Sequence, residues 1–265
     1  MADEVLLRAD REGIATLTLN TPRSINTLSE EIIDALTRTL DAIAEDRSVR
    51  AVILRSAGDH FCAGHNLKEM TERRADADGG LAYFQALFAR CSAMMLRITR
   101  LPQPVIAEVK GIATAAGCQL VATCDLAIAA EDARFATSGV NIGLFCSTPM
   151  VALSRNVGRK HAMEMLLTGA FLPAARAAEL GLVNRVVPRA ELEAASEAMA
   201  RVIVDKSPVA TRIGKRAFYD QLAMPLEEAY AFAGRTMAEN MMAADTRAGI
   251  GAFVAKQPMP DWTGE

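Results

Sequence analysis

Short apolar runs in the first half of the chain predict the strands of a sheet. Val5–Arg8 and Ile14–Leu19 are runs of β type, and the polar residues between them end in a glycine, so a hairpin is predicted. The continuous apolar run Ala51–Leu54 has the length of a strand buried on both faces, Leu126–Ala129 is a second buried strand, and Pro104–Val109 is predicted as another strand. We therefore expect a sheet that begins with a hairpin and continues into fully buried strands.

Between these runs, apolar residues recur at helical spacing. The segment from Ile32 to Ile43 carries them three and four positions apart, which predicts an amphipathic helix. Thr27 and Glu30 have the spacing of a capping box, so Thr27 is the predicted N-cap of that helix. A longer helix is predicted from about Gly80 to Thr99. Strands and helices thus alternate, which is typical of α/β proteins.

The last third of the chain is predicted to be mostly helical. From about Ala190 to Phe253 one helical pattern follows another, with breaks at Ser207-Pro208 and at Pro225, where proline suits a first turn or an interruption. We therefore divide the chain into a β/β/α core over residues 1–190 and a C-terminal helical region over residues 191–265.

Composition and charge narrow the class of protein. The chain has 265 residues, 51% of them hydrophobic and 23% charged, which suits a globular protein with a substantial core. Lys and Arg number 29 against 32 Asp and Glu, a formal charge of −3 without a basic block, so we expect no nucleic-acid partner. No run approaches about eighteen apolar residues, so no membrane-spanning helix is expected.

The N-terminus and the cysteines favour a cytoplasmic protein. The first ten residues are acidic and lack the features of a signal or transit peptide. The five cysteines, an odd number, include no C-x-x-C pair and are interpreted as reduced thiols.

Several common kinds of site are missing from the sequence. Neither G-x-G-x-x-G nor G-x-x-x-x-G-K-[ST] occurs, which removes the two common nucleotide fingerprints. The three histidines form no H-E-x-x-H and have no local carboxylate cluster, so no metal site is expected. The segment Ala136–Val140 falls short of the G-x-S-x-G nucleophile elbow.

Two segments rich in small residues, Phe61–Leu67 and Gly111–Gln119, each follow a predicted strand. The end of a strand is where open α/β folds place ligands. Small side chains let a ligand approach the backbone, and N–H groups in the first turn of a helix have no partner within it. One N–H from each segment could therefore stabilise negative charge on a shared oxygen. The same residues also suit tight turns and close packing, so both interpretations remain open here.

The first of these segments resembles a known motif. Phe61–Met70 resembles the F-x-A-G-A-D-[LI]-K-E-M loop of the enoyl-CoA hydratase/isomerase (crotonase) family, and Val105–Leu120 is similar to its P-V-I-A-A-V-N-G-x-x-x-G-G-G-x-E-L segment. Shorter matches lie at Pro22–Asn26, Cys124–Ala129 and Ala178–Val183. Residues Gly143–Pro149 further resemble one branch of the family. The resemblance spans residues 5 to 256 and implies an α/β crotonase (ClpP-like) β/β/α superhelix with a C-terminal helical trimerisation region.

The resemblance also implies an acyl-CoA site. The oxyanion hole of the family falls on the backbone N–H groups of His65 and Ala116, which would bind the thioester oxygen and stabilise an enolate. The helix that starts near Ala115 would add its dipole. Coenzyme A is then part of the substrate, and no further cofactor is expected. The implied coenzyme A contacts are Ser24, Ile25, Ala63 and Leu67, with Phe253 and Lys256 at the adenine and phosphate end, often across a subunit contact.

The sequence departs from the family at the acid–base positions. In the hydratases two glutamates flank a water, and their positions are occupied here by Gln119 and Gly139. Glutamine can hold a water but cannot accept a proton at neutral pH, and glycine can do neither. His65 is the nearby side chain with a near-neutral reference pKa, but it would also fit as an outward-pointing residue whose N–H alone acts. Cys146, in a loop near the expected pocket, suits a small apolar filler.

We therefore expect a protein that binds an acyl-CoA thioester and stabilises its enolate, in fatty-acid metabolism, with slow hydration. Two other interpretations stay open: a CoA-ester decarboxylase or thioesterase, in which His65 takes part, and a non-catalytic CoA-binding protein. The apolar C-terminal helices, together with the resemblance, predict a homotrimer or a hexamer made of two trimers.

Overall fold

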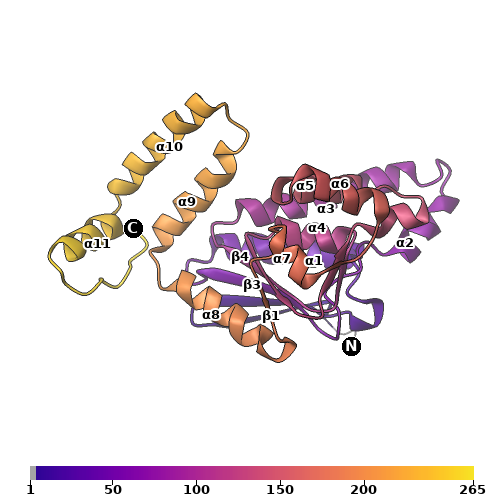
Figure 1. Ribbon diagram of the computed structural model, residues 1–265, viewed down its shortest axis with the longest axis horizontal. Helices are drawn as coiled ribbons and strands as arrows, with labels where there is room; N and C mark the ends of the chain where they lie inside the picture. The colour runs from indigo at the N-terminus through magenta and orange to yellow at the C-terminus, as the bar shows by residue number, and fades with distance from the viewer. Residues whose placement is uncertain (1–3) are drawn as a thin grey trace.

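A six-stranded sheet forms the centre of the computed structural model, which describes residues 4–265 (Figure 1). Its strands are β1 (Leu6–Arg11), β2 (Ile14–Leu19), β3 (Ala51–Ser56), β4 (Val105–Val109), β6 (Leu126–Ala130) and β9 (Arg185–Val187). They lie in the order β1-β2-β3-β4-β6-β9, in which β1 and β2 are antiparallel and every later pair is parallel. The expected hairpin and buried strands are confirmed.

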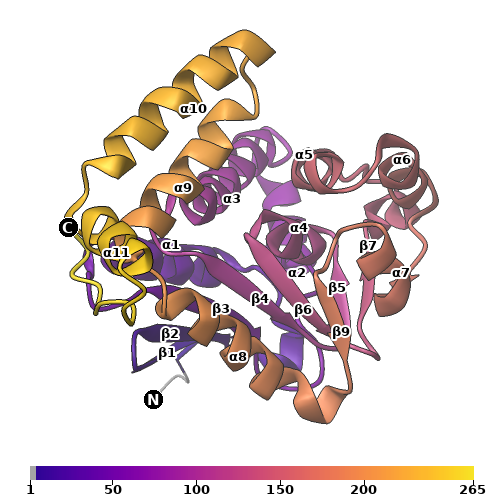
Figure 2. The ribbon, with the colours of Figure 1, turned by 60° about the vertical axis from the view of Figure 1, so that its left-hand side comes forward.

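Helices surround this sheet, and some of them cover its two faces. They are α1 (Glu30–Glu45), α2 (Leu67–Glu72), α3 (Leu81–Arg100), α4 (Ala116–Thr123), α5 (Ser147–Asn156), α6 (Arg159–Thr168), α7 (Ala174–Glu179), α8 (Leu192–Val204), α9 (Pro208–Gln221), α10 (Leu226–Met241) and α11 (Ala244–Val254). The short 3-10 helices are η1 (Pro22–Ser24), η2 (Arg73–Ala75), η3 (Ser138–Ile142) and η4 (Arg189–Glu191). α1, α3 and α4 pack on one face, and α8 crosses the other face (Figure 2).

Strand β3 shows why a continuous apolar run is needed at the centre. Val52 and Leu54 belong to the main core beneath α1 and α3, whereas Ala51 and Ile53 pack on the opposite face with Ala200 of α8. Successive side chains of a strand point to opposite faces, so a strand covered on both sides must be apolar at every position. The carboxyl ends of these parallel strands lead into the loops that form the site.

A second, smaller sheet was not predicted from the sequence. It consists of β5 (Ile112–Thr114), β7 (Arg134–Ala136) and β8 (Leu172–Pro173), in the order β5-β7-β8. Each strand has only two or three residues, too few for an alternation of apolar and polar positions to be visible. This sheet carries the turn that precedes α4 and therefore positions half of the site.

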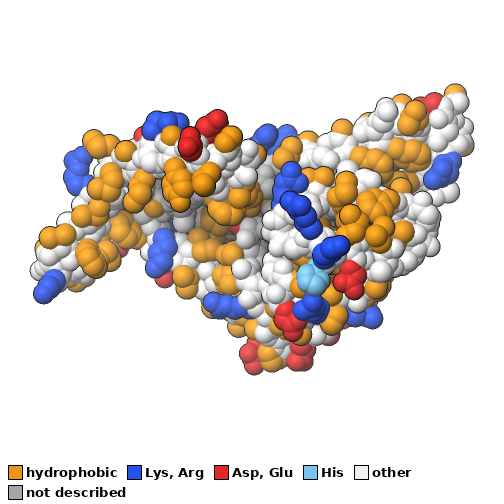
Figure 3. All heavy atoms as spheres, turned by 45° about the horizontal axis from the view of Figure 1, so that its top comes forward, with side chains coloured by type: hydrophobic (Ala, Val, Ile, Leu, Met, Phe, Trp, Pro, Cys, Tyr) orange, Lys and Arg blue, Asp and Glu red, His pale blue; other side chains and the backbone are white. Residues whose placement is uncertain are grey.

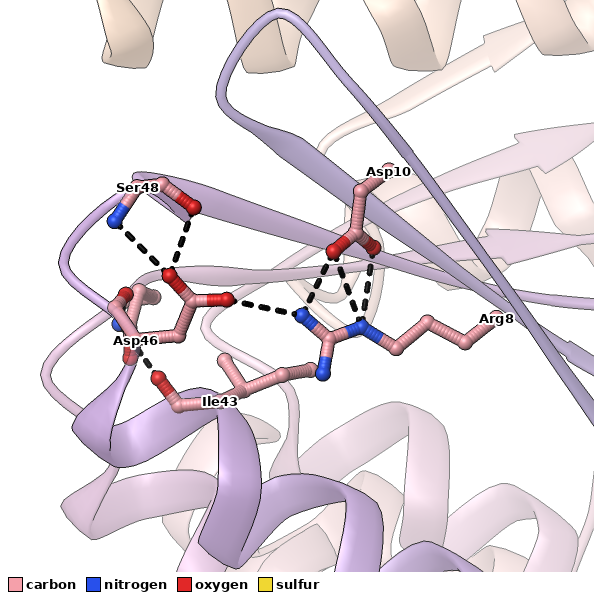
Figure 4. A network of polar contacts seen from close by, with 6 residues as sticks. Arg8, Asp10, Ile43, Asp46 and Ser48 are labelled. Carbon is pink, nitrogen blue, oxygen red and sulfur yellow. Dashed lines mark hydrogen bonds and ion pairs between the residues drawn. The ribbon is translucent and has the colours of Figure 1, made fainter.

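The N-terminal hairpin turns on two residues only. Glu12 and Gly13 both have positive φ, 51° and 80°, the geometry of tight hairpin turns, so β1 extends to Arg11 rather than ending at Arg8. The guanidinium of Arg8 holds Asp10 and reaches Asp46 at the end of α1, at 3.1 Å (Figure 4). Hydrogen bonds from Ser48 lower the pKa of Asp46, so this carboxylate is charged when it holds the hairpin.

The N-cap of α1 differs from the prediction. Ser29, not Thr27, is the cap, and its hydroxyl accepts from the N–H of Ile32 at 3.3 Å. The reason is tertiary: the N–H of Leu28 donates to the carbonyl of Gly64 at 2.7 Å, which keeps the chain extended beyond Thr27. The helix therefore starts two residues later than the capping box suggests.

The helices α9, α10 and α11 form an arm that extends away from the sheet (Figures 1 and 2). Lys215 of α9 fixes the start of the arm, because its ammonium group donates to Asp125 at 2.7 Å and to the carbonyls of Ile98 and Gln103, both at 2.9 Å. The Lys215 side chain is only 6% exposed. Tyr219 also donates to Asp125, at 2.9 Å. α8 lies on the sheet, whereas α9 begins the arm. The division of the chain into a core over residues 1–190 and a helical region over residues 191–265 stays a prediction.

Large apolar side chains are exposed along this arm. They include Phe218, Leu222, Leu226, Tyr230, Met237, Met241, Met242, Phe253 and Val254. Figure 3 shows hydrophobic side chains over the arm and over the adjoining core. Contiguous apolar surface of this kind marks contacts with another molecule in folded proteins.

Candidate functional site

The two segments rich in small residues, one before α2 and one before α4, lie in direct contact. The carbonyl of Cys62 accepts a hydrogen bond from the N–H of Thr114 at 3.0 Å. A Cβ on Gly117 would lie 2.2 Å from the Cys62 carbonyl oxygen, and one on Gly64 would lie 2.9 Å from the Cβ of Ala115. Only glycine allows this approach, so both interpretations of the small residues apply: they permit close packing, and that packing builds the site.

Ala115 holds an unusual backbone conformation at the start of α4. Its φ is 50° and its ψ −121°, a region that an L-residue occupies at a cost of roughly 1–3 kcal/mol and only where its surroundings enforce it. The N–H of Ala115 donates to the carbonyl of Ala136 in β7 at 3.0 Å, which holds the turn. Ala116 is the first residue of α4, so its N–H has no partner within the helix.

The backbone N–H groups of His65 and Ala116 are both available to a ligand. Among residues 4–265, neither donates to a protein acceptor. The Gly64 carbonyl, in the same peptide unit as the His65 N–H, is engaged by Leu28. Because a trans peptide is planar, with C=O and N–H on opposite sides, this bond turns the His65 N–H away from Leu28. The structure thus brings together the two N–H groups predicted to form an oxyanion hole.

These two residues line a cavity of about 330 Å³, which falls within the usual range for small-molecule sites. Its wall consists of Ala63, His65, Leu67, Met70, Phe88, Ala115, Ala116, Ser138, Gly139, Ile142, Leu144, Phe145, Cys146, Ser147, Thr148 and Pro149. No Asp, Glu, Lys or Arg is among these lining residues. The titratable side chains are those of His65 and Cys146, so the cavity is apolar and carries no carboxylate.

The side chain of His65 forms part of the cavity wall. Its ring packs edge-on against Phe88, with ring centroids 5.5 Å apart. Burial lowers the pKa of His65 below its ordinary value, and the nearby carbonyl of Leu28 offsets only part of this. Both ring nitrogens are buried and lack a hydrogen-bond partner in the described part of the chain. The ring therefore does not point outward, and its lowered pKa favours the neutral form.

The two positions of the family glutamates differ in where they lie. Gln119 is buried in α4, is not among the residues that line the cavity, and leaves its Oε1 without a hydrogen-bond partner among residues 4–265. Gly139 does line the cavity, but a Cβ there would lie 2.4 Å from the Leu144 carbonyl oxygen and 2.9 Å from the Cys146 Sγ. The space into which a side chain at 139 would extend is therefore filled.

Cys146 is buried in this wall, as expected of an apolar filler. Burial raises the pKa of its thiol, which disfavours the nucleophilic thiolate at neutral pH. All five cysteines are buried and free. Burial raises the pKa of Cys62 and Cys118 to about 12 in each case.

The predicted coenzyme A contacts fall into two groups. Ala63 and Leu67 line the cavity. The carbonyl of Ile25 accepts a hydrogen bond from the N–H of Ala63 at 3.0 Å, so Ile25 lies beside the cavity, and Ser24 in η1 directly precedes it. Phe253 and Lys256 instead lie at the end of the arm, far from the cavity of the same chain (Figures 1 and 2). A single copy therefore brings the first four residues to the site and leaves these two away from it.

Sequence reasoning missed a polar pair that has one member in the cavity wall. The hydroxyls of Thr114 and Ser138 are 2.8 Å apart, and Ser138 lines the cavity beside Ala116. These residues stand 24 positions apart on two strand ends whose existence the pattern of apolar positions did not indicate. The signal that could have found Ser138 is its place directly before Gly139.

Comparison with known proteins gives a consistent result. The family described as Enoyl-CoA hydratase/isomerase matches residues 9–265. The Xenopus laevis protein named enoyl-CoA hydratase domain-containing protein 3, mitochondrial, is 44% identical over 95% of this chain and 83% of its own length. The human protein of that name is 42% identical over 96% of this chain and 82% of its own length.

Solved structures agree over nearly the whole chain. The crystal structure of an enoyl-CoA hydratase from Mycobacterium smegmatis is 56% identical, with 97% of this chain and 98% of that chain covered and a TM-score of 0.93. The crystal structure of human enoyl-CoA hydratase domain-containing protein 3 is 41% identical, with 97% of this chain and 100% of that chain covered and a TM-score of 0.92. The similarity includes the C-terminal helices, since so few residues remain uncovered.

The expectation of a cytoplasmic protein is wrong. It came from the acidic N-terminus and the unpaired cysteines, whereas the relatives at 40–44% identity are named as mitochondrial. Net charge and thiol pairing describe solubility and redox surroundings, and neither distinguishes one reducing compartment from another. Within the described residues, the structure has no helix both long and apolar enough to span a bilayer.

Proposed function

Because the chain belongs to the enoyl-CoA hydratase/isomerase family, we propose that its cavity binds an acyl-CoA thioester. The chain has the crotonase fold and belongs to the branch of enoyl-CoA hydratase domain-containing protein 3. The carbonyl oxygen of the thioester sits between the backbone N–H groups of His65 and Ala116. The observation that carries this proposal is that these two N–H groups, both without a protein acceptor in the described chain, border one apolar cavity.

The electrostatics of the cavity suit an enolate. The N-terminus of α4, where Ala116 lies, carries the positive end of the helix dipole. Apolar walls keep the local dielectric low, which strengthens hydrogen bonds to a developing negative charge. Both donors belong to backbone that is held in place by the contacts of Gly64 and Gly117, so they need no reorganisation as charge develops.

Hydration is not the activity that this cavity favours. Addition of water to an enoyl thioester requires one group to take a proton from water and another to protonate C2. Gln119 cannot accept a proton and does not line the cavity, and Gly139 has no side chain. His65 is a single group, and within residues 4–265 its buried ring nitrogens have no hydrogen-bond partner that would orient them, so it does not by itself replace both glutamates.

A second candidate is the decarboxylation of a CoA ester that carries a carboxylate on C2. In that reaction the bond between C2 and the carboxylate breaks, carbon dioxide leaves, and the electron pair passes into the thioester enolate, which then takes a proton from water at C2 and leaves hydroxide. An apolar wall without Lys or Arg desolvates the substrate carboxylate, and the enolate formed is the species that the two N–H groups stabilise. No protein carboxylate is needed, which agrees with Gln119 and Gly139.

Assembly into a homotrimer or hexamer belongs to the same proposal. Phe253 is 75% exposed at the end of an arm whose apolar residues have no cover in a single chain, and Lys256 lies three residues beyond it. In an oligomer, the arm of a second copy would bring these two residues to the coenzyme A end of the site. Sedimentation at micromolar concentration should give a multiple of 28.4 kDa, and a monomer would contradict this part of the proposal.

Two ligands that differ only at the thioester carbonyl test the site. Butyryl-CoA has the thioester carbonyl, whereas its thioether analogue S-butyl-CoA lacks that oxygen. We expect both to raise the thermal unfolding temperature, because a ligand that binds only the folded state stabilises it, and butyryl-CoA to raise it more. Equal shifts would contradict the oxyanion hole while leaving coenzyme A binding intact, and no shift with either at millimolar concentration would contradict the proposal as a whole.

A further inference from the structure

The hydroxyl pair of Thr114 and Ser138 occupies a particular place in the cavity. Thr114 and Ala136 are directly paired in the parallel strands β5 and β7. Ala116 and Ser138 each follow that pair by two residues, so they leave the small sheet side by side and both line the cavity. Ser138 therefore borders the same cavity as the N–H that is assigned to the thioester oxygen.

A count of donors and acceptors indicates which of the two hydroxyls donates its proton to the other. Each hydroxyl has one proton to donate, and the two oxygens are 2.8 Å apart, so one hydroxyl donates to the other. Thr114 is buried, does not line the cavity, and has no other side-chain hydrogen bond among residues 4–265. If Ser138 donated to Thr114, the Thr114 proton would be buried without an acceptor, which is unfavourable because a buried donor loses its hydrogen bond to water.

The favoured arrangement has Thr114 donating to Ser138. The Ser138 proton then has no acceptor in the described chain, and the cavity is the space that this residue borders. Thr114 thus acts as a positioning residue: it holds the Ser138 hydroxyl as a hydrogen-bond donor directed at whatever fills the cavity.

We propose that Ser138 selects acyl-CoA thioesters whose acyl chain carries a second carbonyl oxygen near the thioester, as in 3-oxoacyl-CoA; this inference rests on the proposed function. A ketone oxygen only accepts hydrogen bonds, and the Ser138 hydroxyl oriented by Thr114 offers a donor. A saturated chain would leave that donor unpaired in an apolar cavity, which weakens binding. The lining has no Lys or Arg, so the oxygen that it recognises is uncharged.

Affinities of matched ligands for matched variants test this inference. The probes are 3-oxobutyryl-CoA and butyryl-CoA, which differ by the ketone, and the measurement is the dissociation constant by calorimetry. For Ser138→Ala we expect 3-oxobutyryl-CoA to bind about three- to tenfold more weakly than to the wild type, the range for one hydrogen bond, and butyryl-CoA to bind equally well or more tightly, because the variant leaves no unpaired donor beside it. For Thr114→Val we expect a smaller loss, again confined to the ketone ligand.

A second serine of the same wall provides the control. The Ser147 hydroxyl donates to the Phe145 carbonyl at 3.4 Å, so its proton is already engaged. Ser147→Ala should keep the ratio of the two dissociation constants. An equal loss for both ligands in Ser138→Ala, or an unchanged preference for the ketone, would overturn the role of Ser138. Failure of butyryl-CoA to bind the wild type would instead contradict the proposed function, so the two failures are distinguishable.

Discussion

The two sides of the cavity use the chain in different ways. On one side, His65 and Ala116 offer backbone N–H groups that are held by glycines in contact with the neighbouring loop. On the other side, where η3 leads into α5, the family places an acid–base side chain, and this chain has Gly139 instead. Backbone N–H groups remain when a side chain is replaced, so hydrogen bonding by them is retained. Proton transfer by a carboxylate is lost when that one residue is substituted. In the function proposed here, the cavity therefore stabilises an enolate through backbone groups, while the positions of the two family glutamates carry no group that takes or gives a proton.

The largest expected effect concerns hydration. Each acid–base group typically contributes ~10²–10⁴-fold, and the losses are not additive, so we expect crotonyl-CoA to be hydrated at least about 10³-fold more slowly than by a family member with both glutamates. The decrease in absorbance of the enoyl thioester measures this rate. Hydration at the ordinary speed of such an enzyme would show that another group, His65 among them, supplies the missing proton transfers.

Removal of a backbone donor should have the next largest effect. Ala116→Pro deletes one N–H of the oxyanion hole, and we expect any turnover found in a screen of acyl-CoA thioesters to fall about 10²–10³-fold. Proline suits the first position of a helix, and a matched control is Ala244→Pro at the first position of α11, which should retain turnover. Circular dichroism would establish that both variants fold. A folded Ala116→Pro with full turnover would remove this N–H from the site.

A smaller effect, on stability, is expected at Gly139, where neighbouring atoms fill the space for a side chain. A Cβ on Gly139 would meet the Leu144 carbonyl, so Gly139→Ala should lower the free energy of unfolding by about 1–3 kcal/mol. Gly234 in α10 has no neighbouring atom in reach, and Gly234→Ala should raise it by about 0.5–1 kcal/mol. Denaturant titration measures both.

The same contact bears on any attempt to restore hydration. Gln119→Glu combined with Gly139→Glu should not recover it, because the space at 139 is filled and position 119 does not line the cavity. A stable double variant with hydration well above the wild type would show that the loop carrying Leu144 yields to a side chain.

The smallest expected effect is a pH dependence of stability due to His65. Burial lowers its folded pKa, so the unfolded state binds more protons once the pH falls through the ordinary histidine value of about 6.5. The contribution of His65 to stability is therefore present above that pH and is lost below it, until the folded state also protonates. His65→Gln should show a shallower decline in unfolding free energy between pH 7 and 5, within these approximate limits. An unchanged slope would mean that His65 has the same pKa in the folded and the unfolded protein, so that burial does not lower it.

Much of the fold could be predicted from local patterns. Buried strands such as β3 and amphipathic helices such as α1 follow from the period of apolar residues, which depends on neighbours along the chain. The three short strands of the second sheet could not be predicted from their composition. They are strands only because β5 and β8 each pair with β7. The N-cap moved from Thr27 to Ser29 for the same reason, since the bond between Leu28 and Gly64 joins residues far apart in the sequence.

By itself, the sequence determined which atoms are available: backbone N–H groups after two strands, a glutamine at 119 and a glycine at 139. Only the tertiary structure decided where they act. It turned Gln119 out of the cavity wall, filled the space beside Gly139, and placed Thr114 against Ser138 so that one proton is left for a ligand. The physical reason is that donors and acceptors are local properties of a residue, whereas their pairing depends on contacts between segments that the chain brings together only when it folds.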